Sequence, residues 1–266
     1  MRGRQTGQSR KEHNVTDTPR ETRVLAAVVS LVDSLLDDFD VVDLLTGLTE
    51  RCAELLNIEA AGILLADPLH QLRLLAATSE QARELELFQL QADQGPCMDC
   101  YATGQPVSVA DLQAATERWP RFVPAAIDAG FASVHAVPMR AAGIVLGALN
   151  LFGSLPGELT EADLLVGQTL THIACVAILQ EHSPTPATVL PQLRSALASR
   201  VIVEQAKGFL HHMLDVSVEE AFKVLRTYAR AHGEHLTDVA RGLMTDRYSR
   251  PILVADLAEL AATPPR

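Results

Sequence analysis

The spacing of apolar residues divides the chain into a first region with mixed periods and a second region with only the helical period. Apolar residues recur at helical spacing from Val24 to Leu35, and again from Val41 to Leu55. Asp40 directly precedes the second stripe and is a suitable N-cap. The pattern therefore predicts two helices before the first change of period.

Short apolar runs of strand length follow the two helices. The predicted strands cover residues 60–66, 72–78, 107–109, 134–139 and 145–152. The stretch from 90 to 130 is less regular, with a short helical segment after Trp119. A long helix opens at Thr160, where Asp163 is placed to serve its first turn, and runs to about Gln180. This order is typical of an α+β domain with an antiparallel sheet and helices.

After Ser183-Pro-Thr-Pro186, a linker signature, only helical patterns remain. They predict a long helix with Pro191 near its start, a helix between the cap Ser217 and Gly233, and a short third helix. The expected organisation is a disordered tail (1–22), an α+β domain (23–182), a linker (183–192), an all-α three-helix domain (193–248) and a C-terminal tail (249–266).

The long C-terminal helix carries its apolar residues on two faces. Leu193, Leu197 and Val201 share one face, whereas Ala206 and Leu210 lie on another. The first half should meet the preceding domain or a second copy of the chain, and the second half its own bundle. Together with the apolar stripes at 24–36 and 164–179, this predicts a homodimer.

Charge is divided unevenly along the chain. The net charge is −11, which argues against a general nucleic-acid binder. Residues 24–192 carry 6 Lys+Arg against 21 Asp+Glu, whereas residues 193–250 carry 9 against 7. The basic residues of this second segment lie on polar helix faces at spacings that suit phosphate contacts. From charge alone, a solvated face of mixed charges is the more common explanation.

Three segments of the C-terminal region favour an RNA-binding function. They are ASRVIVEQAKGFL (198–210), EAFKVLR (220–226) and LTDVA (236–240). Together they closely resemble the ANTAR family, small three-helix modules that bind paired RNA hairpins and favour transcription antitermination. The resemblance covers about residues 193–248 and implies an RNA-binding output that works as a dimer. It assigns Arg200, Lys207, Arg226 and Arg241 to the RNA surface or its support, with a structural salt bridge as the alternative for each.

The N-terminal region resembles a GAF domain. The resemblance rests on VPMR (137–140), GALNLF (147–152) and the acidic-capped helix that follows. GPC (95–97) and TGQPV (103–107) look like the GAF variant often joined to ANTAR domains in actinobacteria. GAF domains bind cyclic nucleotides, haem, bilins, small metabolites or nothing, so the resemblance leaves a small-molecule ligand as one option and the cofactor unknown.

Cys97 and Cys100 have the spacing of a thiol pair, but the sequence contains no second pair for a structural zinc site. Packing is the first explanation for them, and redox sensing or a ligand pocket is the second. Cys52 and Cys175 fall on apolar helical stripes and are expected in the core. His135 lies in a strand, where a structural role is more common than metal or haem ligation.

These features predict a cytoplasmic, signal-responsive regulator rather than an enzyme. Four cysteines do not make a disulfide scaffold, no apolar run approaches membrane-spanning length, and the Arg-rich N-terminus lacks the apolar core of a secretory signal. No catalytic triad or phosphate-cradling Gly loop stands out. Two alternatives remain open: a thiol-based reductase or redox sensor on the GAF fold, and a DNA-binding regulator whose last two helices form a helix-turn-helix.

Overall fold

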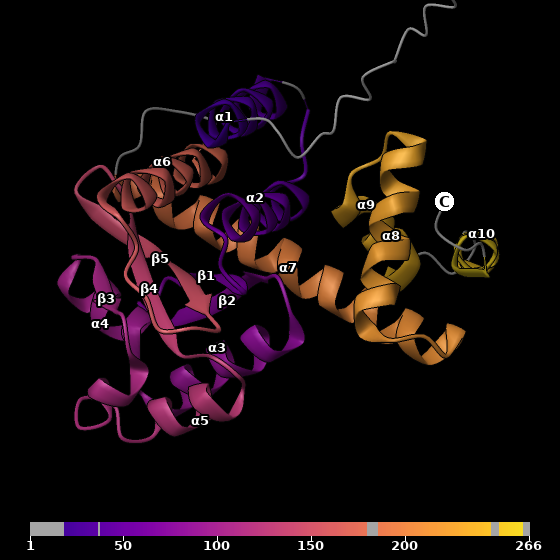
Figure 1. The fold of residues 1–266 in the computed structure, drawn as a ribbon. Helices are drawn as coiled ribbons and strands as arrows, with labels where there is room; N and C mark the ends of the chain where they lie inside the picture. Colours follow the sequence, from indigo (N-terminus) through magenta and orange to yellow (C-terminus); the bar gives the residue numbers. More distant parts are fainter. Residues whose placement is uncertain (1–18, 37, 180–185, 246–249, 263–266) are drawn as a thin grey trace, which may run out of the picture.

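A sheet-containing lobe and a helical bundle, joined by one long helix, make up the chain (Figure 1). The computed structural model describes residues 19–36, 38–179, 186–245 and 250–262. In chain order the elements are α1 Arg20–Leu36, α2 Val41–Leu56, β1 Ala60–Ala66, β2 Leu72–Ala77, α3 Glu80–Ala92, α4 Pro96–Thr103, β3 Val107–Val109, the 3-10 helix η2 Leu112–Ala115, α5 Phe122–Asp128, β4 Ser133–Ala141, β5 Ile144–Gly153, α6 Glu161–Ile178, α7 Pro186–Leu214, α8 Val218–His232, α9 Leu236–Thr245 and α10 Arg250–Ala262.

The sheet of the first lobe has the strand order β2-β1-β5-β4-β3, and all its pairings are antiparallel. Helices α2 and α6 cover one face, with α1 packed on their outer side, and α3, α4 and α5 cover the other (Figure 1). Strand β1 is buried along its whole length because both faces are covered. Its alternate residues enter two different cores: Ile63 packs toward α2 and α6, and Leu64 toward α3–α5.

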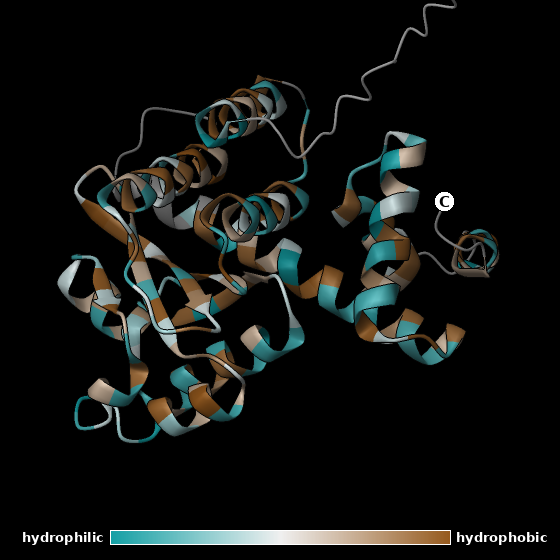
Figure 2. Ribbon diagram, in the orientation of Figure 1, coloured by the Kyte–Doolittle hydropathy of each residue, from teal (hydrophilic) through white to brown (hydrophobic). Residues whose placement is uncertain are grey.

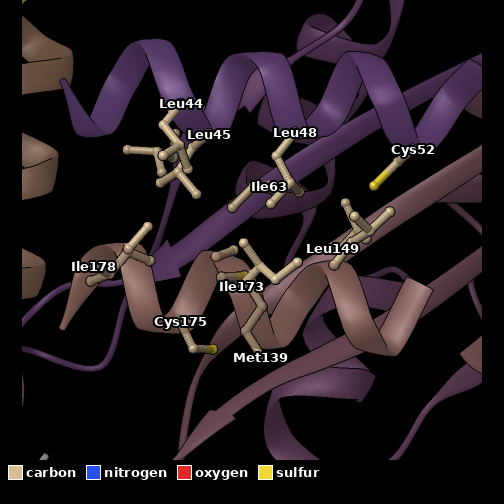
Figure 3. Close-up of a cluster of buried hydrophobic side chains, with 14 of the residues drawn as sticks. Leu44, Leu45, Leu48, Cys52, Ile63, Met139, Leu149, Ile173, Cys175 and Ile178 are labelled. Carbon is tan, nitrogen blue, oxygen red and sulfur yellow. The ribbon is translucent and has the colours of Figure 1, made fainter. Parts of the chain in front are cut away.

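The core between α2, α6 and the sheet is shown in Figure 3. Leu45 and Leu48 of α2 face Ile63, and Ile173 of α6 closes the cluster. Burying a leucine of this kind contributes roughly 1.5–3 kcal/mol. Cys52 and Cys175 both lie in this core and are free thiols, as the apolar stripes predict.

Helix boundaries that carry a capping signal agree with the sequence prediction. Asp40 accepts hydrogen bonds from the backbone N–H groups of Val42 and Asp43. Thr160 and Asp163 form a reciprocal capping box at the start of α6. The five predicted strands are all present, within about two residues of their expected ends.

The sequence pattern does not predict two of the helices, α3 and α4. The buried face of α3 is formed by residues 82, 85, 86, 89 and 92, at regular helical spacing. Two of these residues, Glu86 and Gln89, are polar, so the apolar stripe is interrupted. Helix α4 has only eight residues and lies between Gly95 and Gly104, which gives its sequence the appearance of a loop.

Three expected domain limits are corrected by the helices. Helix α1 begins at Arg20, inside the expected tail of residues 1–22, and α7 begins at Pro186, inside the expected linker of residues 183–192. Residues 250–262 of the expected C-terminal tail form α10, whose Leu257 is fully buried against the bundle. Residues 1–18 and 183–185 of the expected tail and linker lie outside the described residues.

Helix α7 belongs to both lobes. Leu193 and Ala196 lie in the core of the first lobe, and Ala206 and Leu210 lie in the core of the bundle. The jump of the apolar stripe therefore marks the passage between two cores. Val201, at the jump, has an exposed fraction of 55%. Figure 2 shows that the strands are mainly hydrophobic, whereas α8 carries many hydrophilic turns.

Candidate nucleic-acid interface

Two of the four predicted RNA-surface cations are buried on α7. Arg200 and Lys207 are each 8% exposed. Both pair with the Glu204 carboxylate: the Arg200 guanidinium lies 2.6 Å from Oε1, and the Lys207 ammonium 2.8 Å. The Lys207 ammonium also lies 5.2 Å from the centre of the Phe222 ring. The Glu204 carboxylate thus pairs with two cations beside the Phe222 ring.

Burial and charge act against each other in this cluster. Burial lowers the pKa of Arg200 and of Lys207, and the Glu204 charge only partly opposes it. Burial raises the pKa of Glu204, but Arg200 and Lys207 outweigh that effect and leave it below its usual value. Arg83 of α3 lies 4.0 Å from Glu204 and 2.8 Å from Glu80. The cations therefore outnumber the two carboxylates, and the cluster retains positive charge.

The third predicted cation, Arg226 of α8, binds carboxylates of the first lobe. Its Nη1 donates to both oxygens of Glu50, at 2.7 and 2.9 Å, and its Nε donates to Asp43. Arg230, one turn further along α8, also binds Asp43, at 3.1 Å. Burial lowers the pKa of Arg226, but the hydrogen bond to Glu50 and the charge of Asp43 outweigh it and leave the pKa above its usual value.

Three of the four predicted residues share one cleft. Arg200, Lys207 and Arg226 line a space of about 370 Å³ between the two lobes. Arg241 lies apart, in a crevice of about 500 Å³ on the other side of α2, and pairs with Asp238 at 2.6 Å. Each of the four therefore has an intramolecular carboxylate partner in this structure.

The same cleft contains three further cations: Arg83, Lys223 and Arg230. Lys223 and Arg230 belong, with Arg226, to the polar helix face whose basic residues the sequence predicts as possible phosphate contacts. Arg83 gave no such signal. It belongs to the unpredicted helix α3 and reaches the bundle only through tertiary folding.

Several other contacts join the start of α2 to the bundle. The Asp40 carboxylate caps α2 with Oδ1, and its Oδ2 accepts a hydrogen bond of 2.7 Å from the Thr237 N–H at the start of α9. His235 lies 3.1 Å from Asp38. Val42 is fully buried and packs in the bundle core. Helix α2 is thus shared by the two lobes.

The interior of the first lobe holds a polar cluster between the sheet and α3. The Glu86 carboxylate accepts hydrogen bonds from the Asn150 amide at 2.8 and 2.9 Å and from the Gln89 amide. Burial raises the pKa of Glu86 to about 8, although both hydrogen bonds oppose the shift. Gly62 of β1 makes room for this cluster, since a Cβ there would lie 2.5 Å from Glu86 Oε1.

The two paired cysteines lie beside that cluster on α4. Cys97 and Cys100 are both fully buried in the core under α3–α5. Burial raises the pKa of Cys97, with a further contribution from the Glu86 charge, and burial raises the pKa of Cys100 to about 12. Neutral thiols packed in a core are poor nucleophiles and poor metal ligands.

His135 is 2% exposed and its Nδ1 is hydrogen-bonded to the Ser108 hydroxyl of the neighbouring strand. Burial lowers its pKa, so the neutral ring is favoured. Among the residues that the structure describes, no group of three or more His, Cys, Asp or Glu side chains is arranged to hold a metal ion. Within the same residues, no helix is long and apolar enough to cross a membrane.

An α+β lobe with a polar interior is joined to a helical bundle that carries clustered cations, and the two define a two-domain protein. The chain belongs to the GAF domain family: the family model matches residues 40–179, more than half of the chain. An ANTAR domain model matches residues 191–244. A GAF domain is a sensor domain and an ANTAR domain is an RNA-binding antiterminator domain, so both resemblances seen in the sequence are confirmed.

Solved structures similar to the chain include further GAF domains. The GAF domain of an Acinetobacter phosphoenolpyruvate-protein phosphotransferase has 19% identity and a TM-score of 0.48, with 60% of this chain and 94% of that chain covered. Free methionine-R-sulfoxide reductase from Neisseria meningitidis has 18% identity and a TM-score of 0.47, with 67% and 95% covered. At these values the likenesses say nothing of ligand or activity. A comparison with curated proteins finds no match.

Proposed function

We propose that this protein is a cytoplasmic, signal-responsive regulator that binds RNA hairpins through its ANTAR domain and promotes transcription antitermination. The bound RNA segment would be withheld from the competing terminator hairpin. The GAF domain would supply the response to a small-molecule signal or serve in dimerisation. No catalytic step is part of this function.

The observation that carries the proposal is the convergence of three ANTAR-domain cations, Arg200, Lys207 and Arg226, on one cleft between the two domains. A lysine acts as a point charge toward phosphate, whereas an arginine can fork to phosphate or stack on an unpaired base. Phe222 lies in the same cleft, and aromatic faces of this kind stack on the splayed bases of RNA loops. Arg241 would act separately, from α9.

We also propose that the active form is a homodimer. Helices α1 and α6 lie side by side and expose large apolar residues: Leu25 is 66% exposed, Val29 58% and Leu165 65%. Large apolar residues gathered in one exposed patch mark sites of protein association, and we infer that these residues contribute to such a patch. A dimer would present two ANTAR domains, which suits a target made of two hairpins.

A thiol enzyme on the GAF fold is not proposed. Reductase chemistry needs a thiolate that solvent and substrate can reach. Burial of Cys97 and Cys100 disfavours both conditions.

The test is a binding titration of the full chain against an RNA with two hairpins, a single-stranded RNA and a duplex DNA of equal length. Paired hairpins should bind most tightly. Lys207→Ala should weaken that binding and lower the slope of log affinity against log salt by about one unit. Arg23→Ala removes the same charge from exposed α1 and is the matched control.

Circular dichroism of the same samples shows whether the bundle stays folded. Preference for duplex DNA would favour the helix-turn-helix alternative instead. Equal binding by a folded Lys207→Ala variant and the wild type would remove Lys207 from the site.

A further inference from the structure

We propose that helix α2 of the GAF domain covers the RNA surface of the ANTAR domain and competes with RNA for it. Asp43 and Glu50 hold the guanidinium group of Arg226, which the proposed function assigns to the RNA surface. The arrangement in this structure is therefore the closed, RNA-free form. This inference rests on the proposed function and names its regulation.

The first step is the identity of the ligands. Asp43 and Glu50 are seven residues apart on α2, two turns along one helix face. They place three carboxylate oxygens on the Arg226 guanidinium, and Asp43 binds Arg230 as well. An arginine fork recognises carboxylate and phosphate with the same geometry. An RNA phosphate at Arg226 would need the positions that these oxygens fill.

The second step is the shape of α2. Gly47 lies between the two carboxylates, in the middle of the helix, where glycine costs about 1 kcal/mol relative to alanine. A Cβ at this position would lie 3.1 Å from Nη2 of Arg226. The glycine therefore lets the guanidinium approach the backbone of α2, and Nη2 points to the Asp43 carbonyl oxygen at 3.5 Å.

The third step is access. The side chains of Arg200, Lys207 and Arg226 are 10%, 9% and 13% exposed. A hairpin is far too large for the cleft of about 370 Å³ that they line. RNA can reach Arg226 only when α8 moves away from α2, because Asp43 and Glu50 of α2 surround its guanidinium group.

The fourth step is the nature of the interface. Ion pairs join α2 and α8, which makes this interface polar. Crevices of about 500 and 400 Å³ open beside the interface. The buried contribution of α2 to the bundle core is one residue, Val42. Interfaces of this polar, loosely packed kind open readily. Competition by a polyanion can therefore shift the equilibrium between closed and open forms.

The test compares RNA affinities in the full chain. Asp43→Asn/Glu50→Gln keeps the shape of both side chains but removes their charges. Losing two negative charges also raises RNA affinity nonspecifically. Asp33→Asn/Glu54→Gln removes the same charge from exposed positions of α1 and α2 and measures that effect.

The interface variant should bind the two-hairpin RNA on the order of ten-fold more tightly than the control variant, a usual size for coupling between sites. Small-angle scattering should show a larger radius of gyration for the interface variant without RNA. Circular dichroism checks the fold, and Asp43→Asn alone is the milder variant.

Equal RNA affinities for the two double variants, with unchanged scattering, would overturn the competition while RNA binding itself stands. Absence of RNA binding in every protein would overturn the proposed function and this inference with it.

Discussion

Replacement of Glu86 by glutamine should change how the stability of the GAF domain depends on pH. Glu86 is fully buried, and its pKa lies at about 8 in the folded chain against an ordinary value of 4.5. The folded state therefore holds one more proton than the unfolded state between these two values. Its contribution to stability is complete below pH 4.5 and is lost as the pH rises to about 8.

The neutral carboxyl also has a partner available. Asn150 Oδ1 is buried and has no hydrogen-bond partner, while its amide nitrogen faces Glu86. Rotation of the Asn150 amide by half a turn would bring Oδ1 to the proton of a neutral Glu86. A charged Glu86 gains nothing from that rotation, so the rotated amide would stabilise only the protonated acid.

The magnitude follows from the two pKa values. Over the interval from pH 5 to pH 8, the wild type should lose on the order of 3 to 4 kcal/mol of unfolding free energy through Glu86. Glu86→Gln keeps the shape of the neutral acid but cannot ionise, so the variant should not lose this free energy. The free energy of unfolding is measured by urea titration with circular dichroism across this range. The difference between Glu86→Gln and the wild type should grow in favour of the variant as the pH rises.

Glu84→Gln is the matched control, because Glu84 is an exposed carboxylate on the same helix. Its pH dependence should follow that of the wild type. Parallel curves for the wild type and Glu86→Gln would refute the reasoning, since Glu86 would then be charged in the folded protein at neutral pH.

Three further predictions concern other parts of the molecule. Cys97 and Cys100 should react with iodoacetamide only after unfolding, since both thiols are buried and their pKa values are raised; labelling within minutes in the native protein would contradict this. Asp40→Ala should destabilise the chain by about 2 kcal/mol in urea, because it removes a helix cap and leaves the Thr237 N–H unpaired; Asp111→Ala, at the cap of η2, should cost less. Light scattering should give a dimer at micromolar concentration, and a monomer for Leu25→Glu; a wild-type monomer with and without RNA would count against the dimer.

The parts of the fold that follow from local periodicity could be predicted from the sequence. Strand β1 forms an unbroken apolar run because both faces of the sheet are covered. The caps at Asp40, Thr160 and Ser217 mark their helices correctly. The apolar pattern does not predict helix α3 because the buried face of this helix includes Glu86 and Gln89. The polar cluster that these residues form leaves no signature in the spacing of apolar residues.

The sequence likewise predicts only part of the candidate site. The polar faces of α7 and α8 identified Arg200, Lys207 and Arg226, which the structure brings to one cleft. Their partners could not be found by spacing. Asp43 and Arg226 are 183 residues apart in the sequence, and their contact depends on how α7 places the two domains. Local patterns carry no information about such a pairing.

The proposed RNA-binding function is tested most directly by crosslinking the protein to RNA in cells and sequencing the bound fragments. The reads should concentrate on segments that can form two adjacent hairpins ahead of a terminator. Lys207→Ala should reduce their recovery, while Arg23→Ala should not. An absence of enriched hairpin segments, or equal recovery with folded Lys207→Ala, would contradict RNA recognition by the ANTAR domain through this cleft.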